Sequence, residues 1–182
     1  MKKSRAMPDR KPFLALLQQA LENIREEQLF NDERGFQGAL LQELGRRLPE
    51  GRRPEDPMLQ QEYQKRLLRH GIRIRPDIII HVPFERGLAE NREEGNAVAI
   101  ELKRRATSKT ARGAFANLVQ MKKALKYPLT IFINIDSDHT HVALCPKSIA
   151  GQTVCFAVRL EEGRSVVRVE ASRKPAKKMQ GD

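Results

Sequence analysis

Three ionisable residues, Asp77, Glu101 and Lys103, have the types and the spacing that metal-dependent hydrolysis requires. Asp77 follows Pro76 at the head of an isoleucine run, and Glu101 and Lys103 stand two positions apart in a second apolar segment. A carboxylate inside an apolar strand is costly unless it is paired or binds a metal. Two neighbouring carboxylates also repel each other, and a divalent cation removes that cost. We therefore predict a cation site formed by Asp77 and Glu101.

The ion best suited to such a site is Mg²⁺, with Mn²⁺ as an alternative. Magnesium prefers oxygen ligands, keeps several waters and accepts a phosphate oxygen. When bound, it stabilises the charge that develops on a reacting phosphate and lowers the pKa of an attacking water. Lys103 would orient or help deprotonate that water, or hold the scissile phosphate. Desolvation and the cation would lower the pKa of Lys103 while the two carboxylates oppose that shift, so the sequence leaves its role open.

An acidic residue followed two positions later by lysine is a common pattern, and it occurs twice in this sequence. The first occurrence lies in a proline-flanked segment at 9–11, and the second lies in a predicted strand at 97–104. Alternation along that strand places one set of side chains on one face: Val98, Ile100 and Leu102. It places a second set on the other face: Ala97, Ala99, Glu101 and Lys103. The alternative interpretation is an ordinary Glu–Lys pair on a solvated sheet edge, with Asp77 capping a turn.

The elements that must position these residues follow from the apolar periodicity of the sequence. Helices are predicted at 13–29, at 33–48 with Asn31 or Asp32 as the cap, and at 111–125. Strands are predicted at 59–65, 72–82, 97–104 and 129–136. Three further segments are predicted as two or three antiparallel strands with a turn at Glu162-Gly163: 141–145, 154–160 and 165–169.

This order predicts a small α/β fold around a mixed sheet, in a single domain over 1–170 followed by a disordered basic tail at 171–182. The continuous apolar run at 129–136 is typical of a central strand that is covered on both faces. The strand–helix–strand unit at 97–136 should form a parallel crossover. Asp77 and Glu101 lie on consecutive strands joined by a hairpin loop, so they can become neighbours in space.

The segment 31–136, with Pro76-Asp77 and Glu101-Leu102-Lys103, resembles the PD-(D/E)xK nuclease superfamily. The resemblance implies a restriction-endonuclease-like core, in the order helix, three strands, helix, strand, flanked here by an extra N-terminal helix and C-terminal strands. It also implies Mg²⁺-dependent hydrolysis of phosphodiester bonds, usually in DNA, with Asp77, Glu101 and Lys103 as the catalytic residues.

The resemblance further implies a glutamate from the first core helix near the metal. Glu33 is chosen over Glu43 because the apolar stripe of helix 33–48 faces almost the direction of Glu33. The alternative for Glu33 is an acid favoured in the first helical turn by the helix dipole. Glu62, on the preceding strand, is a weaker candidate.

The charge balance of the chain points to a polyanionic partner. Its 182 residues include 34 lysines and arginines and 23 acids, a net charge of +11. Nucleic acid, expected to be DNA, is the default partner of so basic a globular protein. The expected phosphate-backbone contacts are Arg104, Arg105, Lys109, Arg112 and Lys122. The alternative for the helical cations among them is an ordinary solvated helix face.

The expected setting is the cytoplasm. No apolar segment of the sequence is long enough to span a bilayer, and the two cysteines are too few for a disulfide scaffold. The leading hypothesis is a DNA endonuclease, acting alone, as a homodimer or within a larger complex. A resolvase of branched DNA and a non-catalytic nucleic-acid-binding module are the alternatives.

Overall fold

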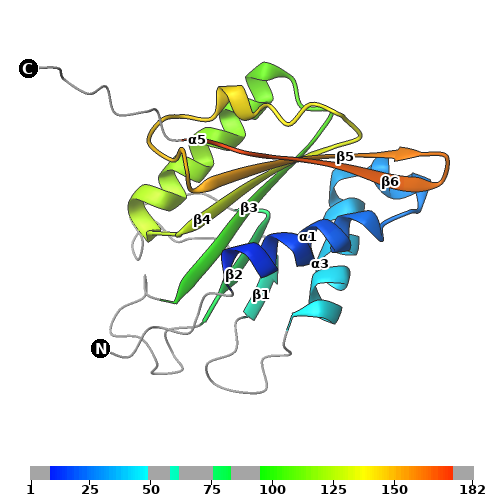
Figure 1. The fold of residues 1–182 in the computed structure, drawn as a ribbon, viewed down its shortest axis with the longest axis horizontal. Coiled ribbons are helices and arrows are strands. Elements are labelled where there is room, and N and C mark those ends of the chain that lie inside the picture. Colours follow the sequence, from blue (N-terminus) through cyan, green and yellow to red (C-terminus); the bar gives the residue numbers. More distant parts are fainter. Residues whose placement is uncertain (1–8, 49–57, 62–75, 83–94, 174–182) are drawn as a thin grey trace, which may run out of the picture.

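A computed structural model of the chain describes residues 9–48, 58–61, 76–82 and 95–173 (Figure 1). The helices are α1 (Arg10–Glu22), α2 (Glu27–Phe30), α3 (Glu33–Arg47), α5 (Ser108–Leu125) and the 3₁₀ helix η2 (Val142–Leu144). The strands are β1 (Met58–Gln61), β2 (Ile78–His81), β3 (Asn96–Arg104), β4 (Leu129–Ile135), β5 (Thr153–Glu161) and β6 (Arg164–Ala171). None of the helices in these ranges is long and apolar enough to cross a membrane.

The strands form one six-stranded mixed sheet, ordered as in the sequence from β1 to β6. β1, β2 and β3 pair antiparallel, β3, β4 and β5 pair parallel, and β6 returns antiparallel to β5. The predicted mixed sheet and the parallel β3–α5–β4 crossover are therefore confirmed. All seven residues of β4 are buried, as predicted for a central strand.

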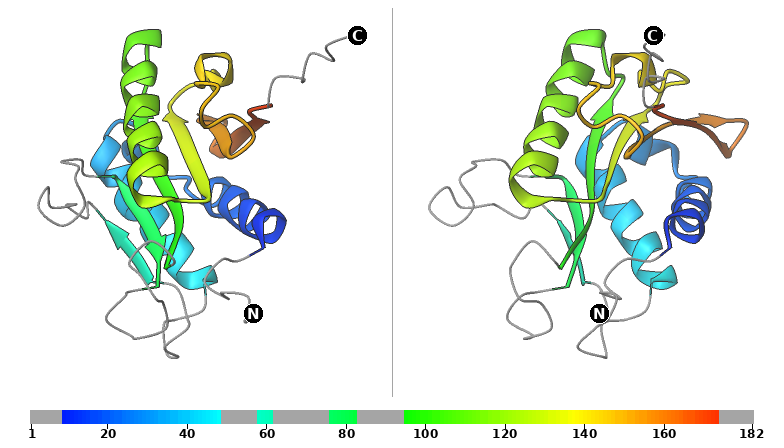
Figure 2. Two further views of the ribbon diagram at one scale, coloured as in Figure 1. Left: turned by 90° about the vertical axis from the view of Figure 1, so that its left-hand side faces the viewer. Right: turned by 60° about the vertical axis from the view of Figure 1, so that its left-hand side comes forward.

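Helices cover the two faces of the sheet in separate layers. Figure 2 shows α5 on one face and α1 and α3 on the other. The larger apolar cluster joins α1 and α3 to one face of the strands, and a smaller cluster joins α5 to the opposite face. The molecule is thus an α/β structure in which β3, the strand of Glu101 and Lys103, is covered from both sides.

The predicted alternation is confirmed for the apolar residues of β3 except at one position. Val98, Ile100 and Leu102 lie in the cluster under α1 and α3, and Ala99 lies under α5. Ala97 was expected beside Ala99, but it belongs to the cluster under α1 and α3. The register between β2 and β3 shifts at Ile80 and His81, and such a bulge gives one strand an extra residue and changes its alternation.

Two predicted elements were wrong, and in both cases a tertiary contact decides the local structure. The helix predicted at 13–29 ends at Glu22, and α2 begins only at Glu27. Ile24, in the break, is buried, and its carbonyl accepts a hydrogen bond from the Ser165 hydroxyl of β6. The strand predicted at 141–145 is instead a turn of 3₁₀ helix, because β5 pairs with the edge of β4 that this segment would need.

The C-terminal hairpin agrees with the sequence except at its end. Glu162 and Gly163 form the predicted turn, both with positive φ (49° and 75°). β6 runs through Ala171, and Ser172 is buried and donates a hydrogen bond to the Thr153 carbonyl, whereas the sequence placed both residues in the tail. Residues 174–182, and the predicted strand residues 62–65 and 72–75, lie outside the described part of the chain.

Candidate active site

The antiparallel pairing of β2 with β3 brings Asp77 to Glu101. Ile78 pairs with Ile100, so Asp77, one residue before Ile78, comes opposite Glu101, one residue after Ile100. The Oδ2 atom of Asp77 accepts a hydrogen bond of 2.6 Å from the backbone N–H of Leu102. The head of β2 is thereby fixed against β3 at the position where the sequence predicts a pair of carboxylates.

Glu101 is an acidic side chain in an almost closed environment, with an exposed fraction of 2%. Its Oε2 atom accepts a hydrogen bond of 3.2 Å from Nδ2 of Asn117 on α5. Its Oε1 atom is buried and accepts no hydrogen bond from any described residue. Burial, reinforced by the charge of Asp77, raises the pKa of Glu101 to about 8, although Asn117 and Lys103 oppose the shift. A buried carboxylate oxygen without a donor is costly, so a proton, a cation or a bound water would stabilise this one.

Lys103 lies at the same end of β3 and pairs with Glu33. Its Nζ atom donates to Oε1 of Glu33 over 2.8 Å, and the backbone N–H of Arg104 donates to Oε2 of Glu33 over 3.0 Å. Burial lowers the pKa of Lys103, but the hydrogen bond to Glu33 and the charges of Asp77, Glu33 and Glu101 outweigh it, so the pKa is raised. Among these protein groups the acids therefore outweigh burial, and Lys103 keeps its positive charge.

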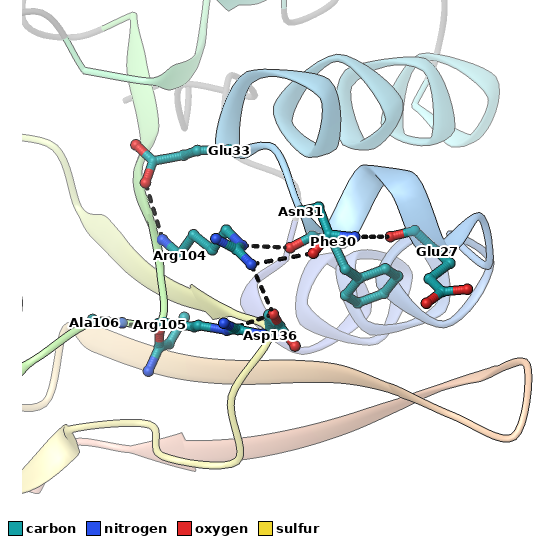
Figure 3. A network of polar contacts seen from close by, with 9 residues as sticks. Glu27, Phe30, Asn31, Glu33, Arg104, Arg105, Ala106 and Asp136 are labelled. Atoms are coloured by element: carbon teal, nitrogen blue, oxygen red, sulfur yellow. Dashed lines mark hydrogen bonds and ion pairs between the residues drawn. The ribbon is translucent and has the colours of Figure 1, made fainter.

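Glu33 reaches this site because α3 begins at a strong cap. The carboxylate of Asp32 accepts hydrogen bonds from the backbone N–H groups of Arg34 (3.2 Å) and Gly35 (2.8 Å), as the sequence predicts for one of its two candidate caps. A Cβ at Gly35 would stand 2.9 Å from Oδ2 of Asp32, so glycine keeps the cap compact. Glu33 therefore projects from the first turn of α3 toward the end of β3 (Figure 3).

Of the other two glutamates considered for this role, Glu43 has different surroundings from Glu33. Glu43 forms ion pairs with Arg46 and Arg47 and accepts a hydrogen bond from Asn23, all within the helical layer. Glu62 lies outside the described part of the chain. Of the three, the structure brings Glu33 to Lys103.

Asp77 and Glu101 are the residues that could hold a metal ion. In residues 9–48, 58–61, 76–82 and 95–173 no group of three or more His, Cys, Asp or Glu side chains could enclose one. Magnesium does not need such a cage, because it is commonly bound by one or two carboxylates together with waters and substrate oxygens. The chemistry of two adjacent carboxylates, one with an unsatisfied buried oxygen, fits that mode of binding.

Arg104 and Arg105, expected at the phosphate backbone, make protein contacts at the ends of β3 and β4 (Figure 3). Arg104 donates to the carbonyl oxygen of Phe30, to Oδ1 of Asn31 and to Oδ2 of Asp136. Arg105 donates to the same Asp136 oxygen over 2.7 Å, yet 65% of its side chain is exposed. The side chain of Arg105 is thus accessible to a binding partner, whereas Arg104 mainly joins α2 to the sheet.

The cations of α5 divide between two flanks of the helix. No acid occurs between Ser108 and Leu125, and Lys109 and Arg112 are exposed. On an ideal helix Lys109 lies about 80° around the axis from Asn117, and Lys122 lies about 140° away on the other flank. Lys122 is half-buried, and burial, with the nearby charge of Lys126, lowers its pKa. Lys109 is therefore nearer the Glu101 flank than Lys122.

Sequence reasoning missed two polar side chains that hold the site together. Gln37 of α3 has an exposed fraction of 2% and donates from Nε2 to the backbone carbonyl of Asp77 over 2.6 Å. Asn117 of α5 holds Glu101 from the opposite face of the sheet. The one available signal was a polar residue beside the apolar stripe of each helix, and that signal does not identify a partner.

The site therefore unites the four predicted catalytic residues: Asp77, Glu101, Lys103 and Glu33. Comparisons of the chain with protein-family models, with curated proteins and with solved structures find no match.

Proposed function

We propose that the protein is a metal-dependent nuclease of the PD-(D/E)xK type, hydrolysing phosphodiester bonds in DNA. The observation that carries the proposal is the buried carboxylate of Glu101, which stands beside Asp77 and has one oxygen that accepts no hydrogen bond from the described residues. Burying one acid beside a second stabilises nothing by itself, so such a pair favours a functional site.

The arrangement of elements supports the proposal. The resemblance implies a core of helix, three strands, helix and strand, and among the described elements α3, β1, β2, β3, α5 and β4 occur in that order. The two carboxylates lie on β2 and β3, the adjacent strands on which the motif of this superfamily falls. We accordingly assign the chain a restriction-endonuclease-like core.

In this mechanism Asp77 and Glu101 would hold a Mg²⁺ ion, or Mn²⁺ in its place. The ion would supply charge stabilisation at the scissile phosphate and would activate the attacking water. Lys103, held by Glu33, carries a positive charge among these acids. A protonated ammonium can bind a phosphate oxygen or orient a water, so these roles are favoured over that of proton acceptor.

The positive charge of the chain supports nucleic acid as the substrate. A net charge of +11 and the acid-free helix α5 would attract a polyanion. Lys109 and Arg112, both exposed, are cations of α5 that could contact the phosphate backbone. Such contacts position a substrate without reading its sequence.

The test is a cleavage panel on single-stranded, duplex and four-way-junction DNA and on RNA, with Mg²⁺ or Mn²⁺ and with EDTA. Cleavage should require the cation and should fall at least about 100-fold in Asp77→Asn, Glu101→Gln and Lys103→Met. Glu43→Gln is the matched control, because Glu43 is a carboxylate of α3 whose partners are Asn23, Arg46 and Arg47.

The same panel distinguishes the competing functions. A strong preference for four-way junctions would indicate a resolvase of branched DNA. Binding without cleavage of any substrate, unchanged in the three site variants, would contradict the nuclease proposal and leave a non-catalytic nucleic-acid-binding module.

A further inference from the structure

Asn117 is the one α5 side chain that the structure bonds to the pair of carboxylates. It lies in the middle of the 18-residue helix, half-buried, at the margin between the apolar stripe and the exposed flank. The residues of α5 that pack on the sheet are otherwise apolar: Ala111, Ala114, Phe115, Leu118, Met121 and Leu125. A polar residue at this margin, with its amide directed to Glu101, suggests a specific role beyond packing.

The hydrogen bond from Asn117 makes the two oxygens of Glu101 inequivalent. Oε2 accepts from Nδ2 of Asn117 over 3.2 Å, whereas Oε1 is buried without a donor from any described residue. The terminal torsion of a glutamate is broad and roughly two-fold, so a carboxylate without such a contact samples many orientations. One directed hydrogen bond therefore selects which oxygen is left over and how it is oriented.

We propose that Asn117 is a positioning residue that fixes the Glu101 carboxylate so that Oε1 is the oxygen presented to the divalent cation. This inference rests on the proposed function, because it concerns the same carboxylate. Loss of the Asn117 amide leaves Glu101 in place but lets its carboxylate rotate. Binding of the cation must then also order the carboxylate, and this loss of conformational entropy weakens the affinity for the cation. Residues that orient a metal ligand in this way typically contribute 10- to 100-fold to metal affinity or activity.

Gln37 acts differently, and the contrast makes the proposal specific. Gln37 donates to the backbone carbonyl of Asp77, so it secures the strand and not a carboxylate. Asn117 is bonded to a carboxylate oxygen itself. A change at Asn117 should therefore appear first in cation affinity.

The experiment measures the Mn²⁺ affinity of the protein in the absence of nucleic acid, by calorimetry or by electron paramagnetic resonance of free Mn²⁺. Asn117→Leu and Asn117→Ala remove the donor, Asn117→Gln keeps an amide, and Glu101→Gln removes the ligand. Val119→Ala is the matched control, since Val119 is a half-buried residue of α5 that packs in the apolar cluster under that helix. Thermal unfolding in EDTA checks that each variant is folded, and either of the two donor-less variants suffices.

The expected result is a Mn²⁺ affinity about 10- to 100-fold weaker in Asn117→Leu or Asn117→Ala, recovered in part by Asn117→Gln and unchanged in Val119→Ala. In cleavage assays the Mn²⁺ concentration for half-maximal rate should rise by a similar factor, with KM for nucleic acid unchanged. Wild-type affinity in the donor-less variants, with binding lost in Glu101→Gln, would overturn the role of Asn117 and leave the proposed nuclease standing. Absence of Mn²⁺ binding and of cleavage in the wild type would overturn both.

Discussion

At the scale of single residues, the chemistry of the site depends on what compensates the buried negative charge of Glu101. Its carboxylate is nearly inaccessible to water, stands beside Asp77 and has one oxygen that no described residue reaches with a donor. A proton or a cation can satisfy that oxygen, and the two compete for it. The protonation of Glu101 therefore links the stability of the protein to pH.

The pKa of Glu101, raised to about 8 from an ordinary value of 4.5, predicts the sign of that linkage. Between these two values the folded chain holds a proton that the unfolded chain releases, so stability falls as pH rises from about 5 to 8. Urea unfolding in EDTA should show this decline in the wild type. Glu101→Gln should remove a contribution of up to about 1.4 kcal/mol per pH unit. Parallel pH profiles for the two proteins would contradict the assignment.

Residue types and spacing were enough to select ionisable side chains that lie together in the fold. Pro76-Asp77 before an apolar run, and the alternation around Glu101 and Lys103, predicted side chains that the structure brings together. Asn117 and Gln37 could not be selected in this way. Each of these two side chains acts through a hydrogen bond from a helix to a residue at the sheet. Which residues such a bond joins is decided by tertiary packing.

At the scale of elements, the end of β3 holds the helical layer through Arg104. The carbonyl of Phe30, the last residue of α2, accepts from Nε of Arg104 over 2.8 Å, and the Arg104 guanidinium also reaches Asn31 and Asp136. Because Glu33 begins the next helix, this contact also stabilises the approach of Glu33 to Lys103.

Arg104→Ala should therefore lower the free energy of unfolding by about 1–3 kcal/mol, because it leaves part-buried acceptors without their charged donor. Arg105→Ala removes a guanidinium that also bonds Asp136 but is 65% exposed, and it should cost at most about 1 kcal/mol. Chemical denaturation of the two variants makes the comparison. Equal costs would show that Arg104 does not join α2 to the sheet.

Local signals in the sequence predicted the elements whose own residues contain the deciding feature, such as a cap or an apolar run. Asp32 and the apolar stripe after it gave α3, and the continuous apolar run gave β4. The break at Ile24 and the 3₁₀ turn after His141 were missed, because a contact with Ser165 and the pairing of β5 with β4 decide them. Both causes are tertiary contacts, about which the periodicity of a segment carries no information.

At the scale of the whole molecule, the positive charge should control nucleic-acid affinity. Each lysine or arginine at a phosphate releases a counterion, so binding weakens linearly in log–log plots against salt, with a slope near −0.9 per contact on duplex DNA. Lys109 and Arg112 lie exposed on an acid-free helix beside the site.

The double variant Lys109→Ala/Arg112→Ala should accordingly reduce the magnitude of the salt slope by about 2 without changing sequence preference. Fluorescence anisotropy at several salt concentrations measures the slope. Lys122→Ala, on the other flank of α5, serves as the comparison and should change the slope less. A larger effect from Lys122 than from Lys109 and Arg112 would place the substrate on the opposite flank.

The central claim is that Asp77 and Glu101 bind one divalent cation next to Lys103, and anomalous scattering from crystals soaked in Mn²⁺ tests it most directly. We predict one anomalous peak within coordination distance of oxygens from both carboxylates, with Oε1 of Glu101 among them, and its loss in Asp77→Asn. A well-ordered site without a peak, in crystals that bind Mn²⁺ elsewhere, would contradict the account.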